Sequence, residues 1–132
     1  MLPIDLARHP AHLGLGATAA AEPEFTGDPA WYGAYGERHV TDGAEGRLVS
    51  MFTFHEPWTT WEMHPKGHEV VVCIAGSMVL HQEHPDGSRS QVSLEPGQYA
   101  INGVAMPPSW THILCSRKGV LAAFAQPTSR QR

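Results

Sequence analysis

The sequence has few basic residues and no long apolar run, and each absence argues against a class of partner. Of its 132 residues, 9 are Lys or Arg and 13 are Asp or Glu, so the formal net charge is -4. Binding to nucleic acid or to anionic lipid needs a basic patch, and none is present. No window approaches the roughly 18 apolar residues of a membrane span, and no signal peptide is recognisable at the N-terminus. These features predict a cytoplasmic protein that binds a small molecule or another protein.

Cysteine is also scarce. Cys73 and Cys115 each lie in an apolar run, and the short Cys spacing of a zinc site is missing. This pattern favours two buried thiols over a disulfide or a pair of ligands.

From Arg47 onward the sequence changes to short segments rich in Val, Ile, Phe, Thr and Trp. Eight of them are LVSMFTF, TTWEMH, EVVVCIA, SMVLHQEH, SQVSL, QYAI, THILCS and VLAAFA. Turn signals separate several of these segments, namely Asp86-Gly87, Pro96-Gly97 and Asn102-Gly103. Short strands with regular turns are typical of an antiparallel sandwich or barrel.

Residues 1–45 differ from the rest of the chain, because they contain scattered Ala, Gly and Pro and no sustained periodicity. We therefore expect an irregular N-terminal arm over 1–45, packed on the barrel or on a partner subunit, and one barrel domain over 46–132.

Chemistry-bearing residues are concentrated in WEMHPKGHEVVVCIAG, residues 61–76. Pro65 and Gly67 argue against a helix there. On a strand, Glu62 and His64 project to one face, and Glu69 begins the next apolar strand. An apolar interior that encloses these three donors favours a bound cation, because buried charges are costly unless they are paired or bound to an ion.

This stretch resembles the first motif of the cupin superfamily, with Glu62 in the place of the first histidine, His64 as the second, then Glu69 and Gly76. The later stretch PPSWTH resembles the second motif and ends on His112. The resemblance covers about residues 47–126 and implies an all-β double-stranded β-helix, or jelly-roll barrel. It also implies a divalent metal ion (Fe, Mn, Zn or Ni) held by Glu62, His64, Glu69 and His112.

Alternatives remain at this site. Glu62 could instead pair with a histidine or with Lys66 in a metal-free polar pocket, and His68 could replace Glu69 as a ligand. We expect His81 and His84 to be solvated beside a hairpin. The residues expected around a bound substrate are Val71, Cys73, Trp110 and Leu114.

The resemblance implies a metal-dependent enzyme that acts on a small carbonyl-containing or aromatic metabolite, with dioxygenase, isomerase or cyclase chemistry. The alternative is a non-catalytic cupin module that senses a ligand or a metal. Strand alternation also places Trp61 and Met63 on an outer face, and such a bulky apolar pair needs cover. We therefore expect the arm, a second subunit in a homodimer, or both to provide that cover.

Overall fold

The computed structural model describes residues 1–58, 60–103, 110–114, 119–125 and 130–131, and beyond residue 103 only the backbone of the strands is described. The strands are β1 (Ala11–Leu13), β2 (Ala19–Ala21), β3 (Arg47–Phe54), β4 (Glu62–Met63), β5 (Glu69–Ala75), β6 (Met78–Glu83), β7 (Arg89–Leu94), β8 (Tyr99–Asn102), β9 (Trp110–Leu114), β10 (Gly119–Ala125) and β11 (Arg130–Gln131). One α-helix, α1 (Pro29–Arg38), and two short 3-10 helices, η1 (Leu15–Ala17) and η2 (Val40–Asp42), complete the described elements. Each of the eight predicted segments overlaps one strand, β3 to β10 in order.

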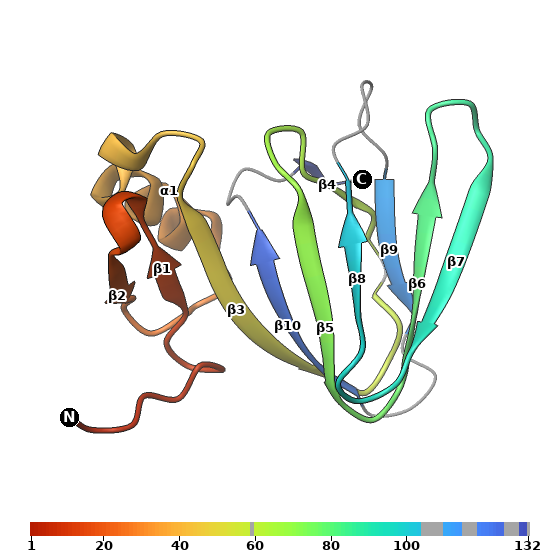
Figure 1. Cartoon of the computed structure of the whole chain (residues 1–132), viewed down its shortest axis with the longest axis horizontal. Helices are drawn as coiled ribbons and strands as arrows, with labels where there is room; N and C mark the ends of the chain where they lie inside the picture. Colours follow the sequence, from red (N-terminus) through yellow and green to blue (C-terminus); the bar gives the residue numbers. More distant parts are fainter. Residues whose placement is uncertain (59, 104–109, 115–118, 126–129, 132) are drawn as a thin grey trace.

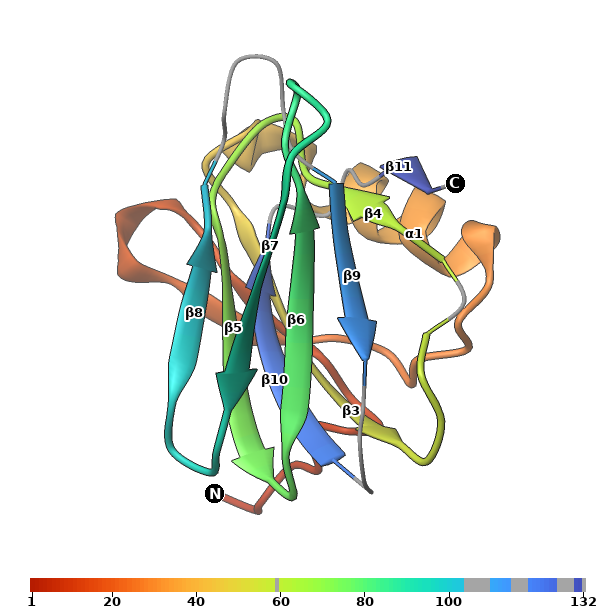
Figure 2. The ribbon, with the colours of Figure 1, turned by 90° about the vertical axis from the view of Figure 1, so that its right-hand side faces the viewer.

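The strands form two antiparallel sheets, ordered β2-β1-β3-β10-β5-β8 and β11-β4-β9-β6-β7 (Figure 1). Figure 2 shows β6, β7 and β9 in front of β5 and β10, so the sheets form two layers. Strands β7 and β8 are edge strands, and no backbone ladder joins them among the described residues. The all-β class is confirmed, whereas the described strands do not close into the predicted barrel.

The hydrophobic core lies between the two layers. Its buried members are Phe54, Val71, Cys73, Met78, Leu80 and Leu94. On β5 and β6 these side chains occupy alternate positions, as expected for strands with one buried face. Cys73 is fully buried, and its thiol donates to the carbonyl oxygen of Ala75 at 3.7 Å. Cys115 lies outside the described residues.

Two of the predicted turns are confirmed by their backbone. Gly87 and Gly97 have φ angles of 81° and 86°, the left-handed region that favours glycine. In the second turn the amide of Gln98 donates to the carbonyl of Glu95 at 3.0 Å. Asn102, by contrast, was expected in a turn and is the last residue of β8.

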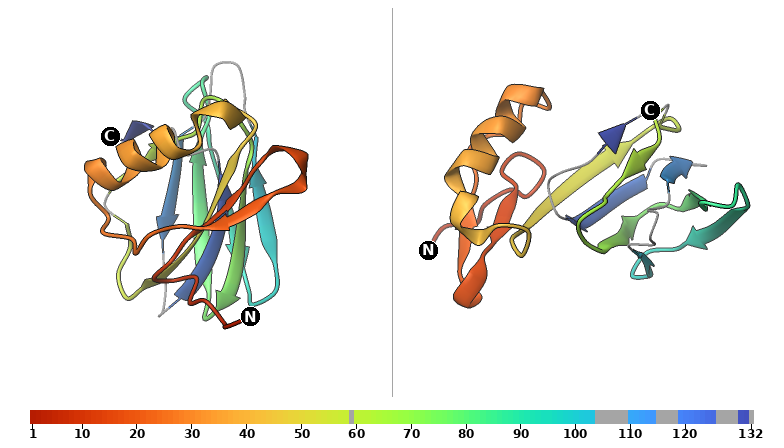
Figure 3. Two further views of the ribbon diagram at one scale, coloured as in Figure 1. Left: turned by 90° about the vertical axis from the view of Figure 1, so that its left-hand side faces the viewer. Right: turned by 90° about the horizontal axis from the view of Figure 1, so that it is seen from above.

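The N-terminal segment is not irregular, which corrects the sequence interpretation. Strands β1 and β2 form a hairpin, and β1 pairs with β3, so the hairpin extends one sheet. Figure 3 shows this hairpin and α1 together on one side of β3. Helix α1 begins after Asp28, whose carboxylate accepts from the backbone amide of Trp31 at 2.9 Å. A strand of three residues is too short for its alternation of buried and exposed side chains to be recognised in the sequence.

A second, smaller core fixes the helix to the sheet. Trp31, Tyr35 and Leu48 are buried there, with Phe25 packed against them. Phe25 also contacts Phe52, at 5.9 Å between ring centroids, and Phe52 packs against the main core. The N-terminal segment and the two-layer fold are therefore joined through aromatic contacts. Among the described residues, no helix has the length and apolarity needed to cross a membrane.

Candidate functional site

Three of the four predicted metal ligands lie close together. The Nε2 atom of His64 is 3.5 Å from Oε1 of Glu69 and 3.9 Å from Oε2 of Glu62. The exposed fractions of these side chains are 12% for His64, 10% for Glu69 and 21% for Glu62. Glu62 lies on β4, His64 follows β4, and Glu69 begins β5. The strand alternation read from the sequence therefore gives the correct neighbours.

Asn102 holds Glu69 from the adjacent strand. Residues Glu69 of β5 and Asn102 of β8 are paired in the sheet register, and Nδ2 of Asn102 donates to Oε2 of Glu69 at 2.7 Å. Burial raises the pKa of the Glu69 carboxyl, an effect that His64 and Asn102 oppose and the charge of Glu62 increases. One oxygen of Glu69 is thus held by the amide while the other lies beside His64. Asn102 was not among the site residues predicted from the sequence.

The alternatives that involve His68 and Lys66 receive no support from their positions. Both side chains are exposed, whereas Glu69, the neighbour of His68, is buried. Consecutive residues at the start of a strand face opposite ways, which accounts for the difference. Of the two, Glu69 is the residue that lies in the cluster.

The fourth predicted ligand is on β9, and its side chain is outside the described residues. The backbone register pairs Thr111 with Glu62 of β4, and it pairs His112 with His81 of β6. The role of His112 therefore stays a prediction. Trp110 and Leu114, predicted to contact substrate, also have side chains outside the described residues.

Two further histidines near this sheet were expected to be solvated. Nε2 of His81 is instead shielded from solvent, which corrects that expectation. The ring of His84 is partly buried, and its Nε2 lies 3.0 Å from the hydroxyl of Ser90.

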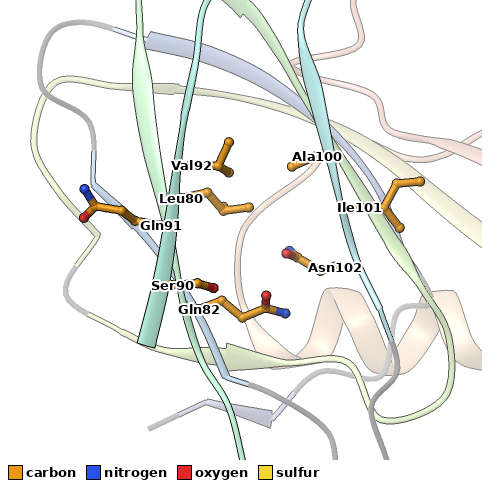
Figure 4. Close-up of a pocket in the computed structure, with 8 residues that line it drawn as sticks. All are labelled: Leu80, Gln82, Ser90, Gln91, Val92, Ala100, Ile101 and Asn102. Carbon is orange, nitrogen blue, oxygen red and sulfur yellow. The ribbon is translucent and has the colours of Figure 1, made fainter. Parts of the chain in front are cut away.

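A pocket of about 160 Å³ lies where the two sheets leave an open edge between β7 and β8 (Figure 4). Its lining residues are Leu80, Gln82, Ser90, Gln91, Val92, Ala100, Ile101 and Asn102. None of these side chains is charged, and amides and a hydroxyl alternate with apolar groups. Asn102 lines this pocket and also makes the hydrogen bond to Glu69, so one residue is shared by the pocket and the surroundings of the carboxylate cluster. Val71 and Cys73, predicted to lie around a bound substrate, are fully buried members of the main core. Their contact with a substrate stays a prediction.

Helix α1 carries one hydroxyl whose electrostatics involve the cluster. Partial burial raises the pKa of the Tyr32 hydroxyl, and the negative charge of Glu62 adds to this shift.

The outer residues of the motif strand are partly covered within the chain. Trp61 and Met63 are both of intermediate exposure. The guanidinium carbon of Arg89 lies 5.5 Å from the centroid of the Trp61 ring, a cation–π contact. The chain itself supplies part of the predicted cover, and the homodimer stays a prediction.

No protein-family model and no curated protein matches the sequence. Solved structures do match. The oxalate decarboxylase of Lactobacillus farciminis, in a formate complex, is 11% identical, with a TM-score of 0.53 over 74% of this chain and 28% of that one. The oxalate decarboxylase of Bacillus subtilis, studied for its Mn(II) centres, is 13% identical, with a TM-score of 0.53 over 74% of this chain and 26% of that one. A cupin-2 domain protein from Shewanella frigidimarina is 11% identical, with a TM-score of 0.45 over 61% of this chain and 70% of that one.

These identities establish a shared fold and nothing about activity. This chain spans only about a quarter of the length of the two decarboxylases, as the shares of 28% and 26% show.

Proposed function

We propose that this chain, which has the cupin fold, is a metal-dependent enzyme acting on a small carbonyl-containing or aromatic metabolite. Glu62, His64 and Glu69 would hold the metal. His112 is proposed as the fourth ligand, from the motif resemblance alone. The observation that carries the proposal is that the carboxylates of Glu69 and Glu62 lie 3.5 and 3.9 Å from Nε2 of His64, and that all three side chains are largely shielded from solvent.

The donor set fits a divalent cation. Two carboxylates that share a buried position repel each other and lose hydration, and a cation between them offsets both costs. Imidazole and carboxylate donors suit Mn, Fe, Zn or Ni, so the residues do not select one of these metals. The Mn(II) centres of the Bacillus subtilis oxalate decarboxylase support the same class of ion.

When bound, such an ion supplies Lewis-acid polarisation of a substrate oxygen or an open position for dioxygen. The chain's own residues position the reactants. Asn102 fixes Glu69 through Oε2, which leaves Oε1 turned to the His64 side of the cluster. A fixed carboxylate loses less conformational freedom when a ligand arrives.

The open-edge pocket supports a neutral and small substrate. Its amide and hydroxyl groups, from Gln82 and Ser90, can donate to a carbonyl oxygen, while Leu80 and Val92 provide apolar contact. A phosphorylated substrate fits less well, because phosphate recognition uses cationic side chains, and the lining residues include none.

The test compares variants of His64, His112 and His68 in the purified, untagged protein. His64→Ala and His112→Ala are each expected to lower the bound metal by one equivalent per chain relative to the wild type. The exposed His68→Ala is the matched control and should leave the metal content unchanged. Equal metal content in His64→Ala and the wild type would contradict the proposed site. A panel of carbonyl-containing and catechol substrates then separates an enzyme from a sensing module, because only the enzyme turns one over.

We further propose that the chain is a homodimer. Ile74 of β5 and Tyr99 and Ile101 of β8 are 47%, 62% and 57% exposed. The register pairs Tyr99 and Ile101 with Val72 and Val70, which puts both on the face opposite the core, and Ile74 is an exposed residue farther along β5. Such an apolar patch favours cover by a second copy. Tyr99→Glu is expected to shift sedimentation at micromolar concentration from dimer to monomer, and a monomeric wild type would contradict the proposal.

A further inference from the structure

The N-terminal segment contains a second cluster of possible ligands, separate from the Glu62 cluster. His12 lies on β1, His39 follows the last residue of α1, and Asp42 ends η2. Each offers one ligand atom, and these atoms all lie within 4.8 Å of one another. His12 is only 3% exposed. Two stretches that are distant in the sequence, β1 and the stretch from the end of α1 through η2, therefore meet at one polar point.

We propose that His12, His39 and Asp42 form a binding site for a zinc-like divalent cation that fastens the N-terminal hairpin and α1 to the sheet. Two imidazoles and a carboxylate match the nitrogen and oxygen ligands of Zn²⁺. The same set suits Co²⁺ or Ni²⁺ and does not suit Mg²⁺ or Ca²⁺, which prefer oxygen ligands alone. The role is structural, because the ligands come from β1, the end of α1 and η2.

Each imidazole has a second partner that fixes its ring. Nδ1 of His12 lies 2.6 Å from the hydroxyl of Tyr35, and Nε2 of His39 is paired with Oε1 of Glu22. Glu22 is itself held by Arg38, whose Nε donates to Oε2 at 3.0 Å. Histidine ligands usually have such an outer partner on the ring nitrogen that does not bind the metal. The outer contacts therefore leave Nε2 of His12 and Nδ1 of His39 as the ligand atoms.

Metal binding at His12 requires a change of tautomer. Nε2 of His12 lies 2.6 Å from Oδ2 of Asp42, so a proton on Nε2 joins the two groups. The metal takes the lone pair of Nε2. The proton of the neutral ring is then carried on Nδ1, from which it donates to the hydroxyl oxygen of Tyr35. The His12 and His39 rings are stacked, with centroids 3.5 Å apart and planes at 14°. Because a ring nitrogen binds a metal in the plane of its ring, binding turns the two rings out of this stack.

Backbone lies directly against the His12–Asp42 pair. A Cβ atom at Gly46 would lie 2.8 Å from Cε1 of His12, and one at Gly14 would lie 2.8 Å from Oδ2 of Asp42. Contacts this close leave no room for a side chain at either position. The two glycines thus let the backbone enclose the pair, which limits how far its two members can separate when they bind a cation.

The test is a zinc titration of the metal-stripped full chain, followed by calorimetry and by thermal melting. Asp42→Asn removes the anionic ligand while its amide oxygen can still accept from His12. We expect the wild type to bind one more equivalent of Zn²⁺ than Asp42→Asn, and zinc to raise the melting temperature of the wild type by a larger amount. Asp28→Asn, at an exposed aspartate of the same segment, is the matched control and should titrate like the wild type. Equal stoichiometry in the wild type and Asp42→Asn would overturn the proposal.

A measurement on the unsubstituted protein covers the case in which Asp42→Asn does not fold. In the NMR spectrum, zinc should shift the ring resonances of His12 and His39 and leave those of the exposed His55, which belongs to neither ligand set, in place. Unchanged His12 and His39 resonances at saturating zinc would also overturn the proposal. Loss of the equivalent assigned to His64 would not affect either result, so the two metal sites are tested independently.

Discussion

Replacing Asn102 with Leu tests whether this amide supports the carboxylate cluster. The substitution keeps a side chain of similar size and removes the donor that lies 2.7 Å from Oε2 of Glu69. Both residues are 8% exposed, so water does not readily replace the lost bond. A hydrogen bond to a charged group contributes about 1.5–3 kcal/mol. Since the apolar leucine offsets part of this loss, we expect the free energy of unfolding to fall by about 2 kcal/mol.

The measurement is urea denaturation of metal-free protein near neutral pH, followed by circular dichroism. With a slope of about 1–3 kcal/mol per M urea for a domain of this size, the midpoint should fall by about 1 M. The same substitution in a Glu69→Leu background is the decisive control. There the amide of Asn102 has already lost its acceptor, so Asn102→Leu should cost nothing or should stabilise the protein. Equal costs in the two backgrounds would refute the role assigned to this hydrogen bond.

Four further substitutions, two of them forming a matched pair, test the fold around the sites. Gly46→Ala should lower the free energy of unfolding by about 1–3 kcal/mol, because the added Cβ would collide with His12. Gly36→Ala lies in α1 with no atom within 4 Å of the added Cβ, so it should instead raise the free energy of unfolding by up to about 1 kcal/mol. Thermal melts in which Gly46→Ala is the more stable variant would contradict the packing described. Gly97→Val should cost about 1–3 kcal/mol, because φ is 86° there, and an unchanged melting temperature would show that the turn is misassigned. Hydrogen bonds from Thr26 and the Trp31 amide lower the pKa of Asp28. The ionised Asp28 carboxylate therefore stabilises the folded protein fully above the ordinary carboxyl pKa of about 4, and this contribution is lost as the pH falls through the lowered pKa of the folded state. Asp28→Asn, which caps without titrating, should therefore lose less stability than the wild type over that acidic range, and parallel melting curves would contradict this.

The main strands could be predicted because their pattern is local. Along β5, for example, Val71 and Cys73 alternate with more exposed residues, and a period of two is visible in the sequence alone. The same alternation correctly grouped Glu62 with His64. The N-terminal hairpin has no such pattern, since β1 and β2 have three residues each. Its strands exist because β1 pairs with β3 in the register His12 to Leu48, and a register between distant segments is not a local property.

The same distinction explains which site residues were missed. His12 and Asp42 are 30 positions apart, and Glu69 and Asn102 are 33 positions apart. Neither pair has a spacing that a motif would record. Asn102 was in addition masked by Gly103, because Asn-Gly is a strong turn signal. In the structure the turn signal yields to strand pairing with Glu69.

Asn102 shows how the open edge of the fold and the carboxylate cluster depend on each other. Its strand, β8, is an edge strand because no ladder joins it to β7 in the described part of the chain. The pocket lies at this open edge. Asn102 is one of its lining residues and also donates a hydrogen bond to Glu69. A ladder between β7 and β8 would close the edge at which this pocket lies. A ligand in the pocket that reaches the Asn102 amide would therefore act on the hydrogen bond that orients the Glu69 carboxylate.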